Sequence, residues 1–320
     1  MKQIVGFVLG PAIVPLILAG ALGCSTGATS ESRATLTVFA AASLTEAFAE
    51  VAGAFEEAHP GVSVDLNFAG SQRLRVQLEH GARADVFASA DERQMDLVRA
   101  SGLLGGEAVD FAGNRLVFIV PGPATEDAKE QDDRSPSPGA SGAGPPAIGS
   151  IDGLARKGLK LAMAHPEVPA GSYARAVLQN MSEDPRFGPD YARRLLDNVV
   201  SEELNVRSVL QKVVLGEADA GIVYVSDALG VSNIDVIPVP EEANVVARYP
   251  MAILRGSAQP ETARAFVRFV TSAEGQAILR GHGFGPPPAT PQSRWDRSAP
   301  FDSGTEASGP TILTSGPPGR

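Results

Sequence analysis

Two serine side chains occupy the same place in two similar segments of the chain. Thr37–Glu46 and Asp65–Leu74 each read as an apolar run, then small residues, then a serine (Ser43 or Ser71) that opens a helical pattern. The first N–H groups of a helix lack intrahelical acceptors and lie at the positive end of its dipole. Such junctions can bind an anion even where they contain no charged side chain. A serine there can also serve only as an N-cap, and Ser43 with Glu46 has the spacing of a capping box.

A third segment offers backbone donors alone. Pro169, Ala170 and Gly171 follow the expected strand 159–164 and precede a helical pattern. Proline stiffens the loop, and the two small residues leave their own N–H groups accessible. The segment is suited to anion binding, although the same residues also fit an ordinary strand-to-helix loop.

Two further segments add one donor each. Asn205 is placed to cap the next helical pattern, which leaves the Val206 N–H as an unpaired first-turn donor. Tyr224 stands near the carboxyl end of an expected buried strand and can present its hydroxyl to a cleft, or be a core tyrosine bonded elsewhere. Arg207 could approach an anion, but in a first helical turn it is more typical of a solvated side chain.

Support for catalysis in the sequence is weak. The four histidines are isolated, and no nucleophile elbow, Cys–His pair, Walker loop or zinc-ligand spacing occurs. His165 and Glu167 form the nearest candidate pair, which is more typical of a loop contact. We therefore expect no enzymatic activity and no cofactor, with a secreted hydrolase built on this pair as a remote alternative.

Composition and the N-terminus bear on location and partners. The chain has 320 residues, 43% hydrophobic residues and a formal net charge of −10, which argues against nucleic acid as a partner. Residues 1–23 have a basic start and a short apolar run interrupted by prolines, which predicts a signal peptide rather than a membrane span. The single cysteine, Cys24, follows at once, as at a bacterial lipoprotein cleavage site, so a lipid anchor on Cys24 and a polar tether over 24–33 are expected.

Strands and helices alternate from residue 34 to about residue 285, which predicts an α/β fold with mainly parallel sheets. The expected strands are 36–41, 63–68, 85–89, 115–120, 159–164, 220–225, 235–239 and 248–254. The expected helices are 44–58, 72–80, 92–100, 171–181, 190–199, 206–215, 260–271 and 274–281. Residues 124–147 read as a flexible loop and residues 286–320 as a disordered tail, both rich in proline, glycine and serine.

Several of these segments together resemble the molybdate-binding proteins of ABC transporters. The matching segments are Val38–Phe48, Phe68–Leu74, Ala84–Asp91, Phe111–Val117, Val168–Ala174, Asn205–Arg207, Gly221–Tyr224, Tyr249–Ile253 and Gly275–Phe284. Their order and spacing carry the resemblance, which covers about 34–285. Position 72 departs from the family, because Gln72 stands where a small residue is common.

The resemblance implies a two-lobed, type II periplasmic-binding-protein fold with the ligand cleft between lobes. Lobe one would hold 34–116 and 249–285, and lobe two 117–248. It implies that the oxyanion-binding residues are Ser43, Ser71, Ala170, Val206 and Tyr224.

The resemblance also implies partners and location. The protein would be a monomer outside the cytoplasm that delivers molybdate, and tungstate as well, to an ABC permease with its ATPase. The lipid anchor would hold it at the membrane surface, in the periplasm or on the outer face of the membrane.

Three more ligand classes remain open at this point: sulfate, ferric iron or an amino acid. Iron-binding proteins commonly use adjacent tyrosines, whereas the four tyrosines here are separate in sequence. An amino acid needs a cation and an acid, for which only Arg207 and Asp227 are candidates. A sensor domain of a regulator is disfavoured by the expected signal peptide and the lack of a DNA-binding segment.

Overall fold

The computed structural model of the protein describes residues 33–122 and 148–289. The predicted signal peptide, Cys24 and the loop 124–147 lie outside these ranges. So do all of the predicted tether except Arg33 and all of the predicted tail except residues 286–289.

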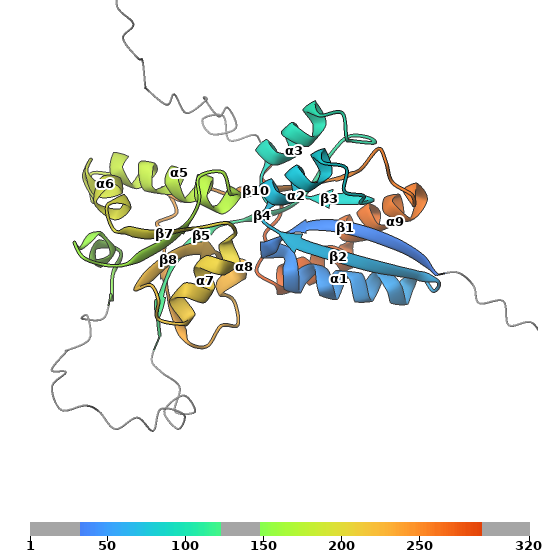
Figure 1. Cartoon of the computed structure of the whole chain (residues 1–320). Coiled ribbons are helices and arrows are strands. Elements are labelled where there is room, and N and C mark those ends of the chain that lie inside the picture. Colours follow the sequence, from blue (N-terminus) through green and yellow to red (C-terminus); the bar gives the residue numbers. More distant parts are fainter. Residues whose placement is uncertain (1–32, 123–147, 290–320) are drawn as a thin grey trace, which may run out of the picture. The chain divides into compact units, whose positions relative to one another are not determined.

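The first sheet contains β1 (Ala34–Ala41), β2 (Val62–Ala69), β3 (Val86–Ala88), β4 (Val109–Asn114) and β10 (Ala247–Ile253), in the order β2-β1-β3-β10-β4. β1 pairs in parallel with β2 and β3, whereas β10 runs antiparallel to β3 and β4. Its flanking helices, visible in Figure 1, are α1 (Thr45–Ala58), α2 (Ser71–Glu79), α3 (Glu92–Ala100), α9 (Pro260–Thr271) and α10 (Ala273–Gly281).

Alternation along the strands explains how both faces of this sheet are covered. In β1, Val38 packs in the core that includes Phe48 of α1, and the next residue, Phe39, packs in the core that includes Leu74 of α2. Successive side chains of a strand point to opposite faces, so these two cores lie on opposite sides of the sheet.

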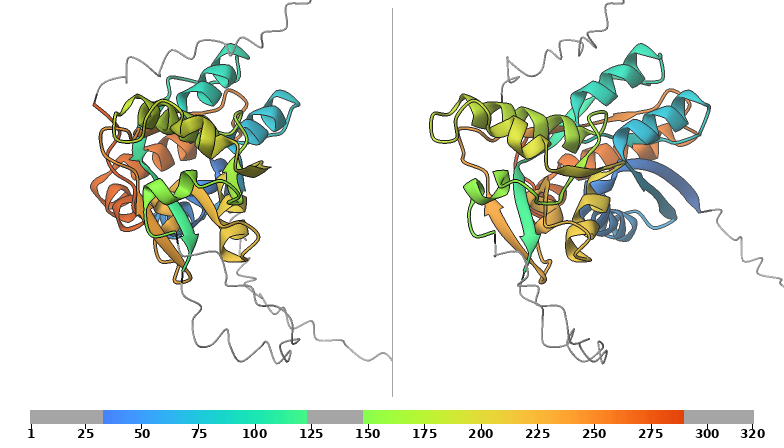
Figure 2. Two further views of the ribbon diagram at one scale, coloured as in Figure 1. Left: turned by 90° about the vertical axis from the view of Figure 1, so that its left-hand side faces the viewer. Right: turned by 60° about the vertical axis from the view of Figure 1, so that its left-hand side comes forward.

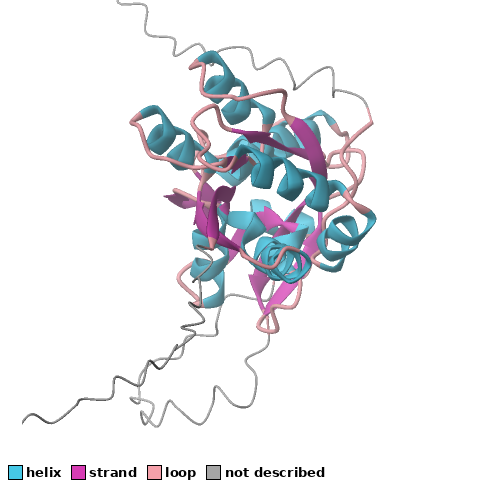
Figure 3. Cartoon of the chain, turned by 90° about the vertical axis from the view of Figure 1, so that its right-hand side faces the viewer, coloured by secondary structure: helices cyan, strands magenta, loops and turns pink. Residues whose placement is uncertain are grey.

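The second sheet contains β5 (Leu116–Pro121), β6 (Leu161–Ala164), β7 (Val199–Glu203), β8 (Ala220–Tyr224) and β9 (Ile234–Pro238), in the order β7-β6-β8-β5-β9. β6 is parallel to β7 and β8, and β5 is antiparallel to β8 and β9. The associated helical segments are η2 (Ile151–Ala155), α5 (Pro169–Glu183), α6 (Tyr191–Leu196), α7 (Val206–Val214) and α8 (Val225–Ala228). Figures 2 and 3 show strands between layers of helices in both halves.

The two reversed strands are the ones next to the connections between the sheets. The chain leaves the first sheet at the end of β4 and enters β5 after Arg115 alone, and it returns from β9 into β10. Each reversed strand therefore comes directly after a crossing between the sheets, β5 after Arg115 and β10 after residues 239–246. The expectation of an α/β fold is confirmed, and each sheet is mixed, with four strands in one direction and one in the other.

Several elements differ from the sequence-based expectations, among them two strands and one helix end. The sequence does not predict β4 and β7, because 109–114 contains Asp110 and Gly113 and 199–203 ends in two glutamates, which obscure the strand pattern. The helix expected over 190–199 ends at Leu196. No helix within 33–122 and 148–289 is long and apolar enough to cross a bilayer.

We predict that Gly171→Ala destabilises the protein while Gly53→Ala stabilises it. A Cβ at Gly171 would lie 2.1 Å from the His165 carbonyl oxygen and 2.3 Å from that of Ala164, whereas a Cβ at Gly53 in α1 meets nothing within 4 Å. The first change costs about 1–3 kcal/mol of unfolding free energy by overpacking, and the second gains about 0.4–1 kcal/mol. Urea unfolding of both variants measures this, and a neutral Gly171→Ala would contradict the close packing of α5 on β6.

Candidate functional site

At the junction after β1, the Ser43 hydroxyl does not cap a helix. A short 3-10 turn, Ala42–Leu44, separates β1 from α1, whose N-cap is Leu44 and has no side-chain capping bond. Ser43 Oγ lies 2.9 Å from the Tyr249 hydroxyl instead. The capping-box prediction for Ser43 and Glu46 is therefore wrong, because the extra turn moves the serine out of the capping position.

Ser71 is also not a cap. It is the first residue of α2, after Gly70, and the α2 N-cap shows no side-chain bond. Its Oγ accepts a hydrogen bond of 3.0 Å from the Ala90 N–H, in the loop after β3. Because a hydroxyl can both accept and donate, this contact fixes the Ser71 oxygen and leaves its proton to be donated elsewhere.

Two helix starts supply backbone donors from the other side. α5 begins at Pro169, two residues earlier than predicted, so Ala170 lies in the first turn and its N–H has no intrahelical acceptor. Asn205 caps α7 as predicted, accepting a 3.0 Å hydrogen bond from the Ser208 N–H. Val206 is then the first residue of α7, with its own N–H unmatched within the helix.

Tyr224 presents an unpaired donor. The side chain is buried at 1% exposure, and its hydroxyl is among the few buried polar atoms of the described residues that lack a hydrogen-bond partner. Burial raises the pKa of the Tyr224 phenol well above its usual value, so the group keeps its proton. Leaving a buried hydroxyl unsatisfied costs about 1–3 kcal/mol, so this group is available to donate to a ligand or a water molecule beside it.

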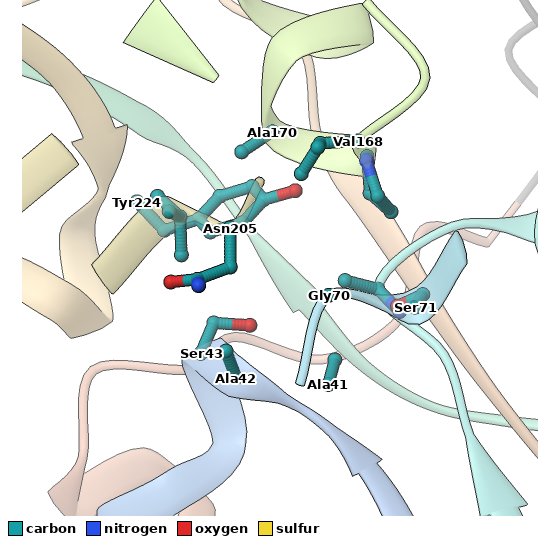
Figure 4. Close-up of a pocket in the computed structure, with 12 residues that line it drawn as sticks. Ala41, Ala42, Ser43, Gly70, Ser71, Val168, Ala170, Asn205 and Tyr224 are labelled. Carbon is teal, nitrogen blue, oxygen red and sulfur yellow. The ribbon is translucent and has the colours of Figure 1, made fainter. Parts of the chain in front are cut away.

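These five residues line one cavity, which Figure 4 shows in close-up. The lining residues are Ala41, Ala42, Ser43, Gly70, Ser71, Ala90, Val168, Pro169, Ala170, Asn205, Val206 and Tyr224. None of these side chains is charged, and they come from both sheets and their helices. The space that these residues enclose is small, so the cavity favours a compact ligand.

Two buried carboxyl groups lie just outside the cavity wall. Burial raises the pKa of Asp91 to about 6, against the opposing effect of the Gln94 N–H and Ser89. Burial likewise raises the pKa of Asp227 to about 7, opposed first by Arg207 and then by the Tyr224 N–H. Both acids are partly protonated near neutral pH, which limits their repulsion of an anion in the cavity.

Side chains also join the two halves around the cavity. Gln72 Nε2 donates a 2.8 Å hydrogen bond to the Leu204 carbonyl oxygen, and Arg93 pairs with Glu167 at 3.2 Å. Arg207, expected to be solvated, instead forms an ion pair with Glu46 of α1 and lies 3.7 Å from Asp227. Gln72 thus bridges the cleft at the position where the family resemblance places a small residue.

The candidate catalytic pair is not assembled. The Glu167 side chain turns to Arg93, and only the Glu167 N–H contacts the His165 ring, at 3.2 Å from Nδ1. The pair therefore makes the loop contact that its spacing suggested.

Sequence reasoning did not predict the contacts that two residues make with the lining, although it named Asp227 as a candidate acid for an amino-acid ligand. Asp227 Oδ2 accepts a hydrogen bond of 3.2 Å from the Tyr224 N–H. The Tyr249 hydroxyl lies 2.9 Å from Ser43 Oγ. Asp227 follows Tyr224 by three residues, which is the one sequence signal that could have indicated it. Tyr249 is distant from Ser43 in sequence and gave no such signal.

Comparison with known proteins identifies relatives along nearly the whole described chain. The family profile of bacterial extracellular solute-binding proteins matches residues 36–285. The molybdate-binding protein ModA of Mycobacterium tuberculosis is 40% identical, covering 85% of this chain and 95% of that protein. The protein of the same name from Escherichia coli is 32% identical, over 78% and 88% respectively. A more distant relative, 25% identical, is named aconitate isomerase, from a Pseudomonas species.

Solved structures support the same fold. The periplasmic molybdate-binding protein of Azotobacter vinelandii superposes with a TM-score of 0.63 at 19% identity, covering 79% of this chain and 100% of that one. The sulfate-binding protein SubI of Mycobacterium tuberculosis gives 0.63 at 18% identity, covering 79% and 87%. At these identities the likeness establishes the two-lobed fold and leaves the ligand open.

We predict that Asp227→Asn flattens part of the pH dependence of stability. An acid whose folded pKa is about 7, against about 3.9 when unfolded, keeps its proton longer in the folded state. Its contribution to the unfolding free energy is present below about pH 4 and is lost as pH rises to about 7. The variant does not titrate, so its stability relative to the original protein should rise over that window and level off above it.

Urea unfolding at several pH values between 4 and 8, in buffers free of oxyanions, measures this difference. Asp91 titrates in both proteins, so its effect cancels in the comparison. A difference that does not change with pH would contradict the assigned protonation of Asp227.

Proposed function

The chain belongs to the bacterial extracellular solute-binding protein family, among relatives of the molybdate-binding proteins, and we propose that it captures molybdate for an ABC transporter. Tungstate, which nearly matches molybdate in size and charge, is proposed as a second ligand. The proposal assigns no enzymatic activity to the protein.

One observation carries this proposal: the cavity is walled by hydrogen-bond donors that the protein itself leaves unused. The Tyr224 hydroxyl is buried without a partner, and the Ala170 and Val206 N–H groups are first-turn donors. The Ser43 and Ser71 hydroxyls complete the set. A compact anion with several acceptor oxygens satisfies all five donors at once.

The energetics of a buried dianion favour many such donors. Removing a dianion from water is costly, and buried charges require hydrogen bonds or charge partners. Each hydrogen bond to a charged group contributes about 1.5–3 kcal/mol net. Five donors and the positive ends of α2, α5 and α7 together offset this cost without a lysine or arginine in the wall.

Among the ligands that compete with molybdate, sulfate fits the geometry of the cavity best. It offers the same charge and the same tetrahedral acceptors, and a sulfate-binding protein shares the fold. The identity of 40% to a molybdate-binding protein favours molybdate. Size separates the two ions, because the metal–oxygen bond is longer than the sulfur–oxygen bond.

Ferric iron and amino acids are less well supported as ligands. Tyr224 and Tyr249, although separate in sequence, have ring centroids only 5.8 Å apart, as an iron site would need. Burial raises the pKa of both phenols, however, which disfavours the phenolates that bind ferric iron. An amino acid finds its candidate cation, Arg207, already paired with Glu46.

The proposal includes location and partners. We place the protein outside the cytoplasm as a lipoprotein anchored through Cys24. It would act there as a monomer that passes its ligand to a permease with its ATPase. The relatives' role in transport supports this placement, and the Cys24 sequence context supports the anchor.

Molybdate and tungstate should stabilise the mature protein strongly. At a ligand concentration a hundredfold above Kd, mass action gives about 2.7 kcal/mol, or roughly 5–10 °C in Tm for a domain of this size. Differential scanning fluorimetry with molybdate, tungstate, sulfate, phosphate, ferric ion and amino acids measures the shifts. A large shift with sulfate and none with molybdate or tungstate would reassign the ligand.

Ser71→Ala should weaken molybdate binding about 10- to 100-fold, because it removes one hydrogen bond to a charged ligand. Isothermal titration calorimetry measures the Kd. Ser101→Ala is the matched control, since Ser101 is exposed at the end of α3 and bonds only Glu79 and Leu97. Equal Kd values for the two variants would mean that Ser71 only supports the Ala90 loop.

Mass spectrometry of the N-terminus tests the lipid anchor. In the protein expressed in a bacterial host, we expect cleavage before Cys24 and a diacylglycerol adduct on its sulfur. Cys24→Ser should abolish the adduct and release the protein from the membrane fraction. An unmodified N-terminus upstream or downstream of Cys24 would contradict the anchor.

A further inference from the structure

A buried pair of hydroxyl groups connects the cavity to β10. Tyr249 is fully buried, and its hydroxyl lies 2.9 Å from Ser43 Oγ, which is itself 5% exposed. Tyr249 stands at a register shift between β10 and β4, and such irregularities re-aim side chains. Its ring also packs against Phe111 and Phe284, at centroid distances of 6.2 and 5.4 Å. The hydroxyl is therefore held in place by the surrounding aromatic rings.

The neighbours of the Tyr249 hydroxyl determine which way the Ser43 hydrogen bond runs. The Asn114 side chain is oriented by two contacts: its Oδ1 accepts from the Arg115 N–H at 2.9 Å, and its Nδ2 donates to Ser226 Oγ at 2.8 Å. Burial raises the pKa of the Tyr249 phenol, and contacts with Ser43 and the Asn114 amide oppose the rise. The Tyr249 hydroxyl lies at hydrogen-bond distance from Ser43 Oγ, whereas the Tyr224 hydroxyl, the other oxygen close to it, has no hydrogen-bond partner. A buried proton needs an acceptor, so the Tyr249 proton has Ser43 Oγ as its acceptor.

We propose that Tyr249 is a positioning residue that determines specificity: by donating to Ser43 Oγ, it obliges the Ser43 hydroxyl to donate into the cavity. This inference rests on the proposed function, in which an oxyanion accepts from Ser43. The chain of donation runs from Tyr249 through Ser43 to the ligand. Hydrogen bonds in such a chain polarise and strengthen one another.

The consequence is that the Ser43 hydroxyl faces the cavity as a donor rather than as an acceptor. Without Tyr249, the Ser43 oxygen would be free to accept a proton from a ligand hydroxyl, because a serine can act in either role. With Tyr249 in place, a protonated ligand oxygen beside Ser43 meets a donor there and leaves its own proton without an acceptor at that position. Tyr249 therefore selects fully deprotonated oxyanions over protonated ones, independently of their size.

Sulfate and phosphate separate this effect from size. They are tetrahedral ions of nearly equal size, but at neutral pH sulfate carries no proton and phosphate carries at least one. The experiment measures, by competition against bound molybdate at pH 7.5, the concentration of each ion that displaces half of it. Tyr249→Phe keeps the ring and removes the hydroxyl. We expect it to weaken molybdate binding about 3- to 10-fold and to reduce the preference for sulfate over phosphate about tenfold.

Tyr191→Phe is the matched control, because Tyr191 is a buried tyrosine whose hydroxyl donates to the Ile151 carbonyl oxygen at 2.7 Å and does not line the cavity. It should leave the sulfate-to-phosphate preference unchanged. In a Ser43→Ala background, Tyr249→Phe should change the preference by less than about twofold, since a double-mutant cycle isolates the effect transmitted through Ser43.

The outcomes distinguish this inference from the proposed function. If the original protein binds molybdate but Tyr249→Phe weakens all oxyanions equally, the proposed function stands and the role of Tyr249 is overturned. The same holds if the full effect of Tyr249→Phe persists in the Ser43→Ala background. An original protein that binds no tetrahedral oxyanion would contradict both.

Discussion

Buried hydrogen-bond donors without acceptors in the protein are the constraint on which the site depends. A free Tyr224 hydroxyl and free first-turn N–H groups are unfavourable when buried, unless a ligand supplies the missing oxygens. The donors keep their positions because neighbouring residues hold them through contacts within the protein. Asn205 caps α7 next to Val206, and Ala90 holds the Ser71 oxygen. The donors are therefore ordered before the ligand arrives.

Topology brings the donors together. Ser43 and Ser71 follow neighbouring parallel strands, β1 and β2, so their junctions lie at one edge of the first sheet. Tyr224 ends β8 of the second sheet, and the short β4–β5 connection places that sheet beside the first. The cleft contacts Gln72–Leu204 and Arg207–Glu46 then join the two halves around the cavity.

Neutral donors and shielded acids would allow a chain with a net charge of −10 to hold the proposed anion. No charged side chain lines the cavity, and its nearest buried carboxyls have raised pKa values. Binding therefore depends on local dipoles and on the direction of each hydrogen bond. The role proposed for Tyr249 is to set this direction at Ser43.

Local sequence patterns were enough to predict the α/β fold and every residue of the candidate donor set, because strand-to-helix junctions with small residues and hydroxyls are short-range features. Such patterns also placed the Asn205 cap correctly. They failed for Ser43, where an intervening 3-10 turn and a partner 206 residues away replaced the predicted capping box. The partners of Arg207, the protonation of Asp227 and the contact of Tyr249 with Ser43 emerged only from the folded chain. These depend on burial and on contacts between distant strands, which no local spacing records.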